Sequence, residues 1–155
     1  MTDFQKSMVP MDRYFKRTKV KNDQPERILQ RKICDHLRTF YPKAYFMSDP
    51  SGLKLSPNIL KLLKATRSSH SQLDIAIMEP SHEYKGLFLE VKAKSPYKQS
   101  GEIYKDEHLL DQLLVMEYLK KKGYNCKFTW SLDHAVEILT GYLGQPITTN
   151  EPLFP

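Results

Sequence analysis

Two carboxylates and a lysine stand out in the middle of the sequence, because each interrupts or closes an apolar run. Asp74 lies in the alternating segment QLDIAIM at 72–78, and Glu90 and Lys92 close the run GLFLEVK at 86–92. Side chains alternate along a strand, so Glu90 and Lys92 would share one face. If the two segments are neighbouring strands in a suitable register, Asp74 meets them there.

Such a cluster suits metal-assisted chemistry on a phosphate. Mg²⁺ takes carboxylate, carbonyl and water oxygens and often bridges to phosphate. A metal polarises the phosphate and acidifies a water, while a lysine steadies the nucleophile or the developing charge. Glu90 and Lys92 alone would more often be a structural ion pair at a strand end, since structural pairs often imitate sites. Asp74 favours the site, because a carboxylate among apolar side chains is costly unless paired or metal-bound.

The elements that would position these residues follow from hydrophobic periodicity and from proline and glycine. Strands are expected at 44–47, 72–78, 86–92 and 124–130. Helices are expected from Pro25 to about 40, after Ser56-Pro57, through 109–119, and from Ser131 to about 142. The short connection at 79–85 favours a hairpin, and 93–105 reads as a polar loop. This order predicts one mixed α/β domain, a hairpin-containing sheet with helices packed on it.

Leu73-Asp74, then fifteen residues, then Glu90-Val91-Lys92 resembles the PD-(D/E)XK nuclease motif in its helix-strand-strand-strand-helix-strand setting. SGLK at 51–54, KGLFLEVKAK at 85–94, Gln112 and KKGYNCKFTWSLDHAVEILTGYL at 121–143 extend the likeness to a stand-alone, phage-type VRR-NUC domain. The resemblance implies a PD-(D/E)XK restriction-endonuclease-like core, with a mixed central sheet flanked by helices. It divides the chain into a basic N-terminal arm (1–24), a VRR-NUC-like nuclease domain (25–143) and an irregular C-terminal tail (144–155).

The resemblance also implies roles for the central residues. Asp74 and Glu90 would be metal ligands, and Lys92 would be the catalytic lysine. The backbone carbonyl of Val91 would complete the inner ligands, with Mg²⁺ as the cofactor and Mn²⁺ as a substitute. The motif's proline is replaced by Leu73, so the turn before the aspartate can differ, although proline supplies no ligand.

Two further residues match the family on its helices. Gln112 matches a helix glutamine, and its place beside Leu109, Leu113 and Met116 points it toward the sheet. Glu26 matches an acidic residue on the first helix, which could bind a second metal or orient a water. Without the resemblance, Gln112 would pass for a solvated or satisfied core glutamine, and Glu26 for an acid that favours a helix N-terminus.

Basic residues flank the predicted site in sequence and could follow phosphates on either side of the cut. They are Lys54, Lys61, Lys64, Arg67, Lys94 and Lys98. The net charge of +6 and the pI of about 9.2 support a polyanionic partner. Moderate basicity is also common among proteins that bind no nucleic acid, so a solvated basic surface is the alternative. The basic arm could contact DNA or a second subunit, or could be a solvated tail.

The composition fits one soluble globular domain. The chain has 155 residues, of which 40% are hydrophobic and 27% charged. Cys34 and Cys126 show no ligand spacing, so we expect buried, reduced thiols rather than a disulfide framework or a zinc site. No apolar stretch reaches membrane-spanning length, and the N-terminus lacks the apolar core of a signal peptide. We therefore expect no membrane association and a cytoplasmic location, in the host cell if the protein is phage-encoded.

Together these observations predict a Mg²⁺-dependent endodeoxyribonuclease that hydrolyses phosphodiester bonds. The resemblance adds branched DNA, such as a Holliday junction, as a candidate substrate and a homodimer as the candidate assembly. A non-catalytic nucleic-acid-binding module on a nuclease-like fold is the alternative, and a structural domain with an incidental ion pair is a third reading. The complete set of Asp74, Glu90 and Lys92 argues against the binding module, and the structural domain would leave the expected burial of Asp74 unexplained.

Overall fold

The computed structural model describes residues 24–50 and 54–146. The basic arm predicted at 1–24, apart from Gln24, lies outside these residues, as does most of the predicted tail. Among the described residues, no helix combines the length and the apolar composition that crossing a membrane requires.

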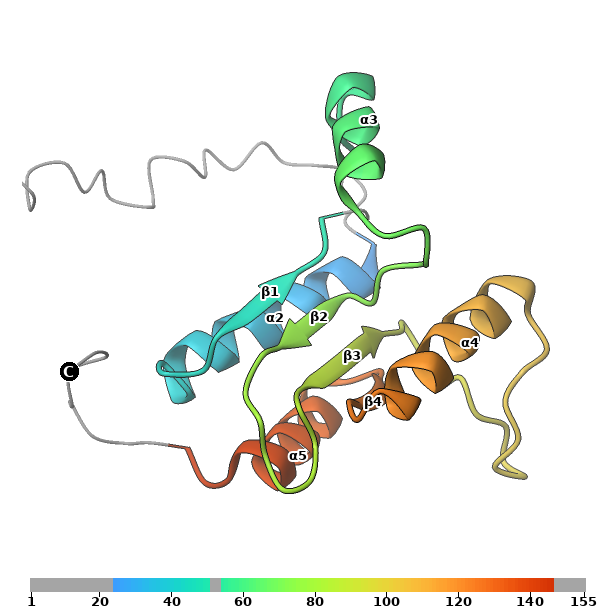
Figure 1. The fold of residues 1–155 in the computed structure, drawn as a ribbon. Helices are drawn as coiled ribbons and strands as arrows, with labels where there is room; N and C mark the ends of the chain where they lie inside the picture. The colour runs from blue at the N-terminus through green and yellow to red at the C-terminus, as the bar shows by residue number, and fades with distance from the viewer. Residues whose placement is uncertain (1–23, 51–53, 147–155) are drawn as a thin grey trace, which may run out of the picture.

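The order of elements agrees with the order predicted from the sequence (Figure 1). The elements are α2 (Pro25–Phe40), β1 (Phe46–Ser48), α3 (Pro57–Thr66), β2 (Ile75–Ile77), β3 (Leu87–Val91), α4 (Glu107–Lys121), β4 (Asn125–Thr129) and α5 (Leu132–Leu143). Ser56 is the N-cap residue of α3 and Ser131 that of α5. Each side chain accepts a hydrogen bond from a backbone N–H of the first turn. Pro25 and Pro57 occupy the first positions of α2 and α3, where the helix makes no hydrogen bond to the backbone nitrogen and the missing N–H of proline is tolerated.

The strands of the described residues form one four-stranded mixed sheet in the order β1-β2-β3-β4. β2 pairs antiparallel with both β1 and β3, so the predicted hairpin is confirmed, whereas β4 runs parallel to β3. The parallel pair requires a crossover, which α4 and the loop before it supply. The carboxyl ends of β3 and β4 therefore meet at one edge of the sheet.

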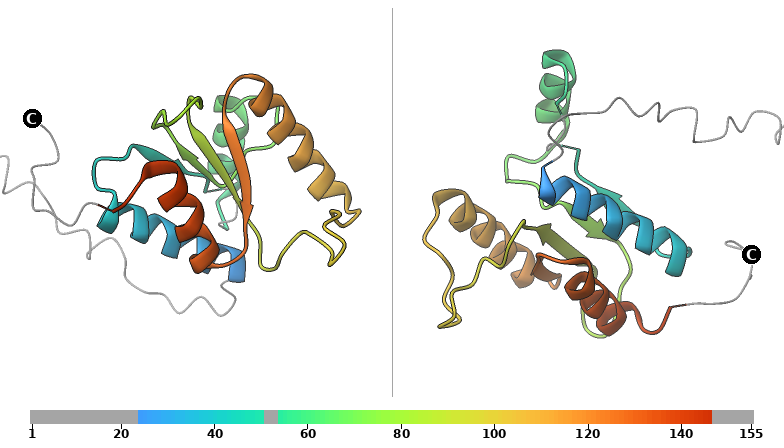
Figure 2. Two further views of the ribbon diagram at one scale, coloured as in Figure 1. Left: turned by 90° about the horizontal axis from the view of Figure 1, so that it is seen from below. Right: turned by 180° about the vertical axis from the view of Figure 1, so that it is seen from behind.

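Helices cover both faces of the sheet, as the view from below shows (Figure 2). α2 and α5 pack on the face that carries Ile75, Leu87 and Leu89, which are fully buried. α4 packs on the other face against a smaller cluster that includes Cys126 and Phe128. Both cysteines are free and buried, as predicted. The observed architecture is the predicted one, a mixed α/β sheet flanked by helices.

The helix α3 differs from the others because none of its residues is buried. It projects away from the sheet (Figure 1). Ile59 and Leu62 are 48% and 61% exposed, so the apolar residues that predicted this helix do not pack into either core cluster.

Candidate active site

Asp74, Glu90 and Lys92 are brought together where β2 and β3 lie side by side. Ile75 is paired with Leu89, and the antiparallel register therefore sets Asp74 opposite Glu90. The ammonium nitrogen of Lys92 lies 3.2 Å from Oε1 of Glu90. The juxtaposition that the sequence made conditional on strand register is thus present.

Asp74 was expected within a strand over 72–78, but β2 begins at Ile75, and Asp74 lies one residue before it. On the side that faces β3, the carboxylate of Asp74 accepts a hydrogen bond from the backbone of the neighbouring strand. Oδ2 of Asp74 accepts a hydrogen bond from the backbone N–H of Val91 at 2.7 Å, beyond the last paired residue of β2. The shorter strand therefore points a carboxylate at the end of β3.

A glutamine that the sequence did not single out holds the backbone of Asp74. The side-chain amide of Gln30, on α2, donates to the carbonyl oxygen of Asp74 at 3.2 Å. It also donates to the carbonyl of Asp49 at 3.0 Å and to the hydroxyl of Ser48 at 2.7 Å. Gln30 therefore ties α2 to the ends of β1 and β2. A polar residue on an amphipathic helix gives no signal of such a role.

Gln112 reaches the same carboxylate from α4, as its predicted orientation toward the sheet requires. It is 4% exposed, and its amide donates to Oε1 of Glu90. Its amide nitrogen also lies 3.2 Å from Nε2 of His108, one turn earlier on the helix. Glu90 itself is 3% exposed, and its Oε2 has no hydrogen-bond partner within the described residues. This buried, unpartnered oxygen is suited to a bound cation.

The electrostatics of the two carboxyl groups follow from burial. Desolvation raises the pKa of Asp74 and of Glu90 above the ordinary carboxyl range, because burial disfavours the charged form. The charge of Asp74 raises the pKa of Glu90 further, and the Lys92 ammonium opposes both shifts. Two like charges held this close favour a cation between them.

Glu26 lies near the cluster, as its match to the family's first-helix acid implied. It occupies the first turn of α2, and its Oε1 accepts a hydrogen bond from the backbone N–H of Ala93 at 3.2 Å. Its charge contributes to the raised pKa of Asp74. Glu26 therefore connects the start of α2 to the chain directly after Lys92.

The residues present fit a Mg²⁺ ion better than a cation that takes all of its ligands from the protein. The described residues contain no cluster of three or more histidine, cysteine or acidic ligands. Mg²⁺ usually keeps several waters and is bound through one or two carboxylates together with substrate phosphate. Asp74 and Glu90 supply that number. For Val91, the contact in the structure is made by its N–H, and the role of its carbonyl stays a prediction.

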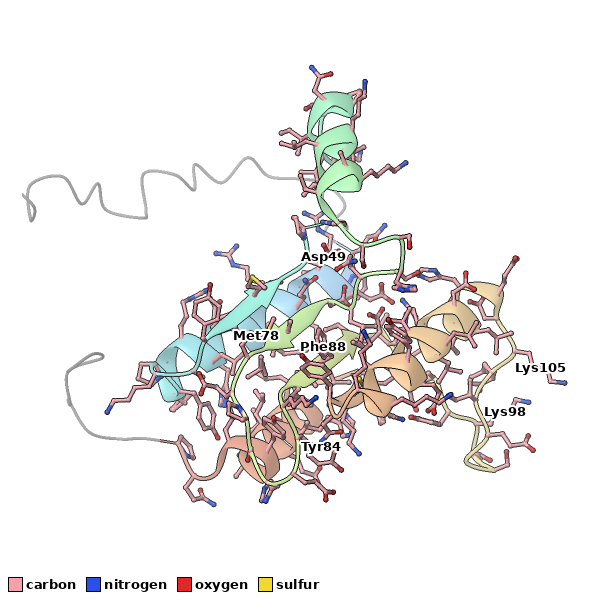
Figure 3. All side chains as sticks on the ribbon, viewed as in Figure 1. Asp49, Met78, Tyr84, Phe88, Lys98 and Lys105 are labelled. Carbon is pink, nitrogen blue, oxygen red and sulfur yellow. The ribbon has the colours of Figure 1, made fainter. Side chains whose placement is uncertain are left out.

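The predicted phosphate-contacting residues differ in how free their side chains are. Lys54, Lys61, Lys64 and Lys94 are exposed. Lys98 is ion-paired with Glu102 at 3.8 Å. Arg67 is ion-paired with Asp49 at 2.5 Å, and Asp49 lies at the base of α3 in Figure 3. The sequence did not single out Asp49, whose backbone N–H also donates to the carbonyl of Asp74 at 2.7 Å.

No protein-family model matches the chain, and no curated protein matches its sequence. Among solved structures, one described as a "VRR_NUC domain protein" is similar with a TM-score of 0.53 and 16% sequence identity. The similarity covers 80% of this chain and 92% of that chain. At this identity the likeness concerns the fold alone. The chain therefore has a VRR-NUC-like α/β fold, in agreement with the predicted fold class.

Proposed function

We propose that this protein is a metal-dependent endonuclease that hydrolyses phosphodiester bonds in DNA. The observation that carries the proposal is the meeting of Asp74, Glu90 and Lys92 at the ends of two paired strands. Burial raises the pKa values of the carboxyl groups of Asp74 and Glu90, and one oxygen of Glu90 has no hydrogen-bond partner among the described residues. The VRR-NUC-like fold and the motif resemblance support a place in the PD-(D/E)XK superfamily.

Asp74, Glu90 and the carbonyl of Val91 would hold Mg²⁺, or Mn²⁺ as a substitute. When bound, the cation would polarise the scissile phosphate and acidify a water. Lys92 would stabilise the attacking water and the developing negative charge. Its ammonium lies against Glu90, beside the proposed metal ligands, and its side chain is 15% exposed. Gln112 would fix the orientation of Glu90, and Glu26 would hold the backbone after Lys92.

The net charge of +6 supports DNA as the substrate. Two groups of lysines would contact phosphates, one preceding or on α3 and the other in the loop after β3. The first group is Lys54, Lys61 and Lys64, and the second is Lys94 and Lys98. In Figure 3 the base of α3, marked by Asp49, and the loop that carries Lys98 and Lys105 lie well apart. A strand crossing the site could therefore meet cations on both sides of the cut.

Selectivity for branched DNA and a homodimer are finer parts of the same proposal. A four-way junction needs two coordinated cuts, and a twofold dimer would supply two equivalent sites. The arm at 1–24, for which contact with DNA or a partner was one reading and a solvated tail the other, lies outside the described residues apart from Gln24. Light scattering of the protein alone and on junction DNA tests the assembly, and a monomer in both states would contradict the dimer while leaving the nuclease proposal intact.

The central experiment measures cleavage of linear, forked, flapped and four-way DNA with Mg²⁺, Mn²⁺ or excess EDTA. We expect Mg²⁺ and Mn²⁺ to support cleavage and EDTA to abolish it. Asp74→Asn and Glu90→Gln should abolish cleavage, whereas Glu117→Gln, on an exposed carboxylate of α4, should not. Undiminished cleavage in EDTA would contradict the metal mechanism. Binding without cleavage of any substrate would favour the non-catalytic binding module.

A further inference from the structure

A hollow of about 300 Å³ lies beside Lys92, where the first turns of α2 meet the carboxyl ends of β3 and β4. Its apolar walls come from α2 and from the junction between β4 and α5, and two lysines complete it. These side chains include Ile28, Leu29, Lys32, Lys92, Trp130 and Leu132. Ile28 is 43% exposed, so the residues that the structure describes leave this apolar surface uncovered. The volume lies at the lower end of the roughly 300–1,000 Å³ typical of small-molecule sites.

The strand register places this hollow next to the candidate active site. β3 and β4 pair in parallel up to Val91 and Thr129, and the N–H of Lys92 donates to the carbonyl of Thr129 at 2.8 Å. Trp130 therefore follows β4 at the level where Lys92 follows β3. A group bound in the hollow would lie beside the phosphate that Lys92 is proposed to serve.

The indole ring of Trp130 is fixed before any ligand binds. One contact is a stack on His134, with ring centroids 4.0 Å apart and an interplanar angle of 26°. Another is an edge contact with Tyr97 at 5.9 Å. The ring is only half-buried, so part of its surface is left to line the hollow. A preorganised aromatic surface loses little side-chain entropy on binding a planar partner.

We propose that this hollow binds one unstacked nucleobase next to the scissile phosphate, with Trp130 as its stacking partner. The proposal rests on the proposed function, since it takes the bound strand to be the nuclease substrate. The walls suit a planar heterocycle, and Lys32 and Lys92 suit the phosphates joined to it. The charged side chains that line the hollow in the described part of the chain are Lys32 and Lys92, which suit an anionic ligand such as a nucleotide. The carboxylate of Glu26 is held on the backbone N–H of Ala93, another lining residue.

This site would narrow the class of substrate. A base inside a duplex is stacked on both faces, and it must leave the stack before it can enter a pocket. An unpaired nucleotide has no such cost. The hollow would therefore select DNA with an unpaired nucleotide beside the cut, as at a bulge, a flap or a branch point, over a fully paired duplex.

Trp130 is the only tryptophan in the sequence, so fluorescence excited where tyrosine does not absorb reports on the surroundings of this one side chain. The protein is titrated in EDTA with a thymidine oligonucleotide, with an abasic strand of equal length and charge, and with a paired duplex. We expect the base-bearing strand to quench Trp130 and the other two to have little effect. An equal response to the abasic strand, a bound strand without quenching, or no binding of the base-bearing strand would each overturn the proposal.

Substitutions provide a second test, with affinity measured by anisotropy of labelled strands. Trp130→Leu should weaken binding of the base-bearing strand by about 5- to 150-fold, the range of one base–aromatic stack, and leave the abasic strand unaffected. Trp130→Phe should retain most of the affinity. Tyr45→Leu is the matched control, because Tyr45 is 64% exposed and precedes β1 at the opposite end of the sheet. Circular dichroism and thermal unfolding verify that each variant is folded.

Failure of this inference can be distinguished from failure of the nuclease proposal. Base-dependent quenching without cleavage of any DNA would contradict the nuclease and keep the base site. Metal-dependent cleavage with equal responses to base-bearing and abasic strands would contradict the base site alone. Cleavage that prefers an unpaired nucleotide in the wild type, and loses that preference in Trp130→Leu, would support both.

Discussion

Gln112 donates its side-chain amide to Oε1 of Glu90, the same oxygen that lies 3.2 Å from the ammonium of Lys92. Both donors meet on one oxygen and leave Oε2 of Glu90 without a partner in the described part of the chain. The glutamine would thus orient the carboxylate so that one oxygen is available to a cation.

Gln112→Leu removes this donor and keeps a side chain of similar size. We expect the Mg²⁺ affinity to fall by about 10- to 100-fold, the usual effect of losing a residue that orients a metal ligand. Calorimetric titration with Mg²⁺ and the Mg²⁺ dependence of cleavage measure this loss. Gln145→Leu, on an exposed residue after α5, should leave both unchanged. An unchanged Mg²⁺ affinity in Gln112→Leu would show that Gln112 only packs.

Lys92→Ala separates chemistry from binding. We expect cleavage to fall by at least about 100-fold, because the lysine is proposed to act on developing charge at the reaction centre. Metal and DNA affinities should change only a few-fold. Lys94→Ala is the matched control two residues later, since Lys94 is exposed, and it should weaken DNA binding and its salt dependence slightly. Normal cleavage by Lys92→Ala would show that its catalytic assignment is wrong.

The fold could be predicted from the sequence because hydrophobic period, prolines and helix-starting serines all indicate the same elements. Ser56, Ser131 and Pro25 lie where the structure begins its helices. The strand over 72–78 was predicted too long, because alternation continues through Asp74, whereas the backbone pairing with β3 ends at Ile75. Periodicity describes which side chains share a face, and it does not show where a side chain replaces the backbone as a hydrogen-bond acceptor.

The candidate site was predictable where residue type is unusual for its position, and not where a common residue acts through tertiary contact. A carboxylate in an apolar strand is such an exception, so Asp74 could be identified. Gln30, Asp49 and Trp130 are ordinary in their local sequence. Their contacts join segments far apart in the chain, and only the assembled fold brings them to the edge where β3 and β4 end.

Arg67 offers a test of whether a predicted DNA contact is instead structural. Its ion pair with Asp49 is largely shielded, with side chains 22% and 8% exposed. We expect Arg67→Ala to lower the free energy of unfolding by about 1–3 kcal/mol, less than for a fully buried pair, because the arginine side remains partly hydrated. Urea unfolding measures this change.

Lys61→Ala and Lys64→Ala are the matched comparisons, because both lysines are exposed on α3. They should leave stability within about 0.5 kcal/mol and reduce the salt dependence of DNA binding. Should Arg67→Ala reduce that salt dependence as much as they do, with no loss of stability, Arg67 would be a phosphate contact as first predicted.

The raised pKa values of the buried carboxyl groups predict how stability depends on pH without metal. Burial raises the pKa of Asp74 to about 6 and that of Glu90 to about 8. The folded protein therefore binds these protons more tightly than the unfolded chain. Their contribution to stability is complete below the ordinary carboxyl pKa and is lost as pH rises through the folded values. In EDTA, the melting temperature should fall by a few degrees between about pH 5 and pH 9.

Added Mg²⁺ should reverse this decline, because a cation stabilises the charged carboxylates that high pH leaves buried together. The rise in melting temperature caused by Mg²⁺ should therefore grow with pH over the same interval. Glu90→Gln carries no titrating proton at this position, so its melting temperature in EDTA should depend less on pH and respond less to Mg²⁺. Glu117→Gln should behave as the wild type, because Glu117 is 61% exposed. If the wild type and Glu90→Gln follow the same pH dependence in EDTA, the buried carboxyl pair does not control the stability of the metal-free protein.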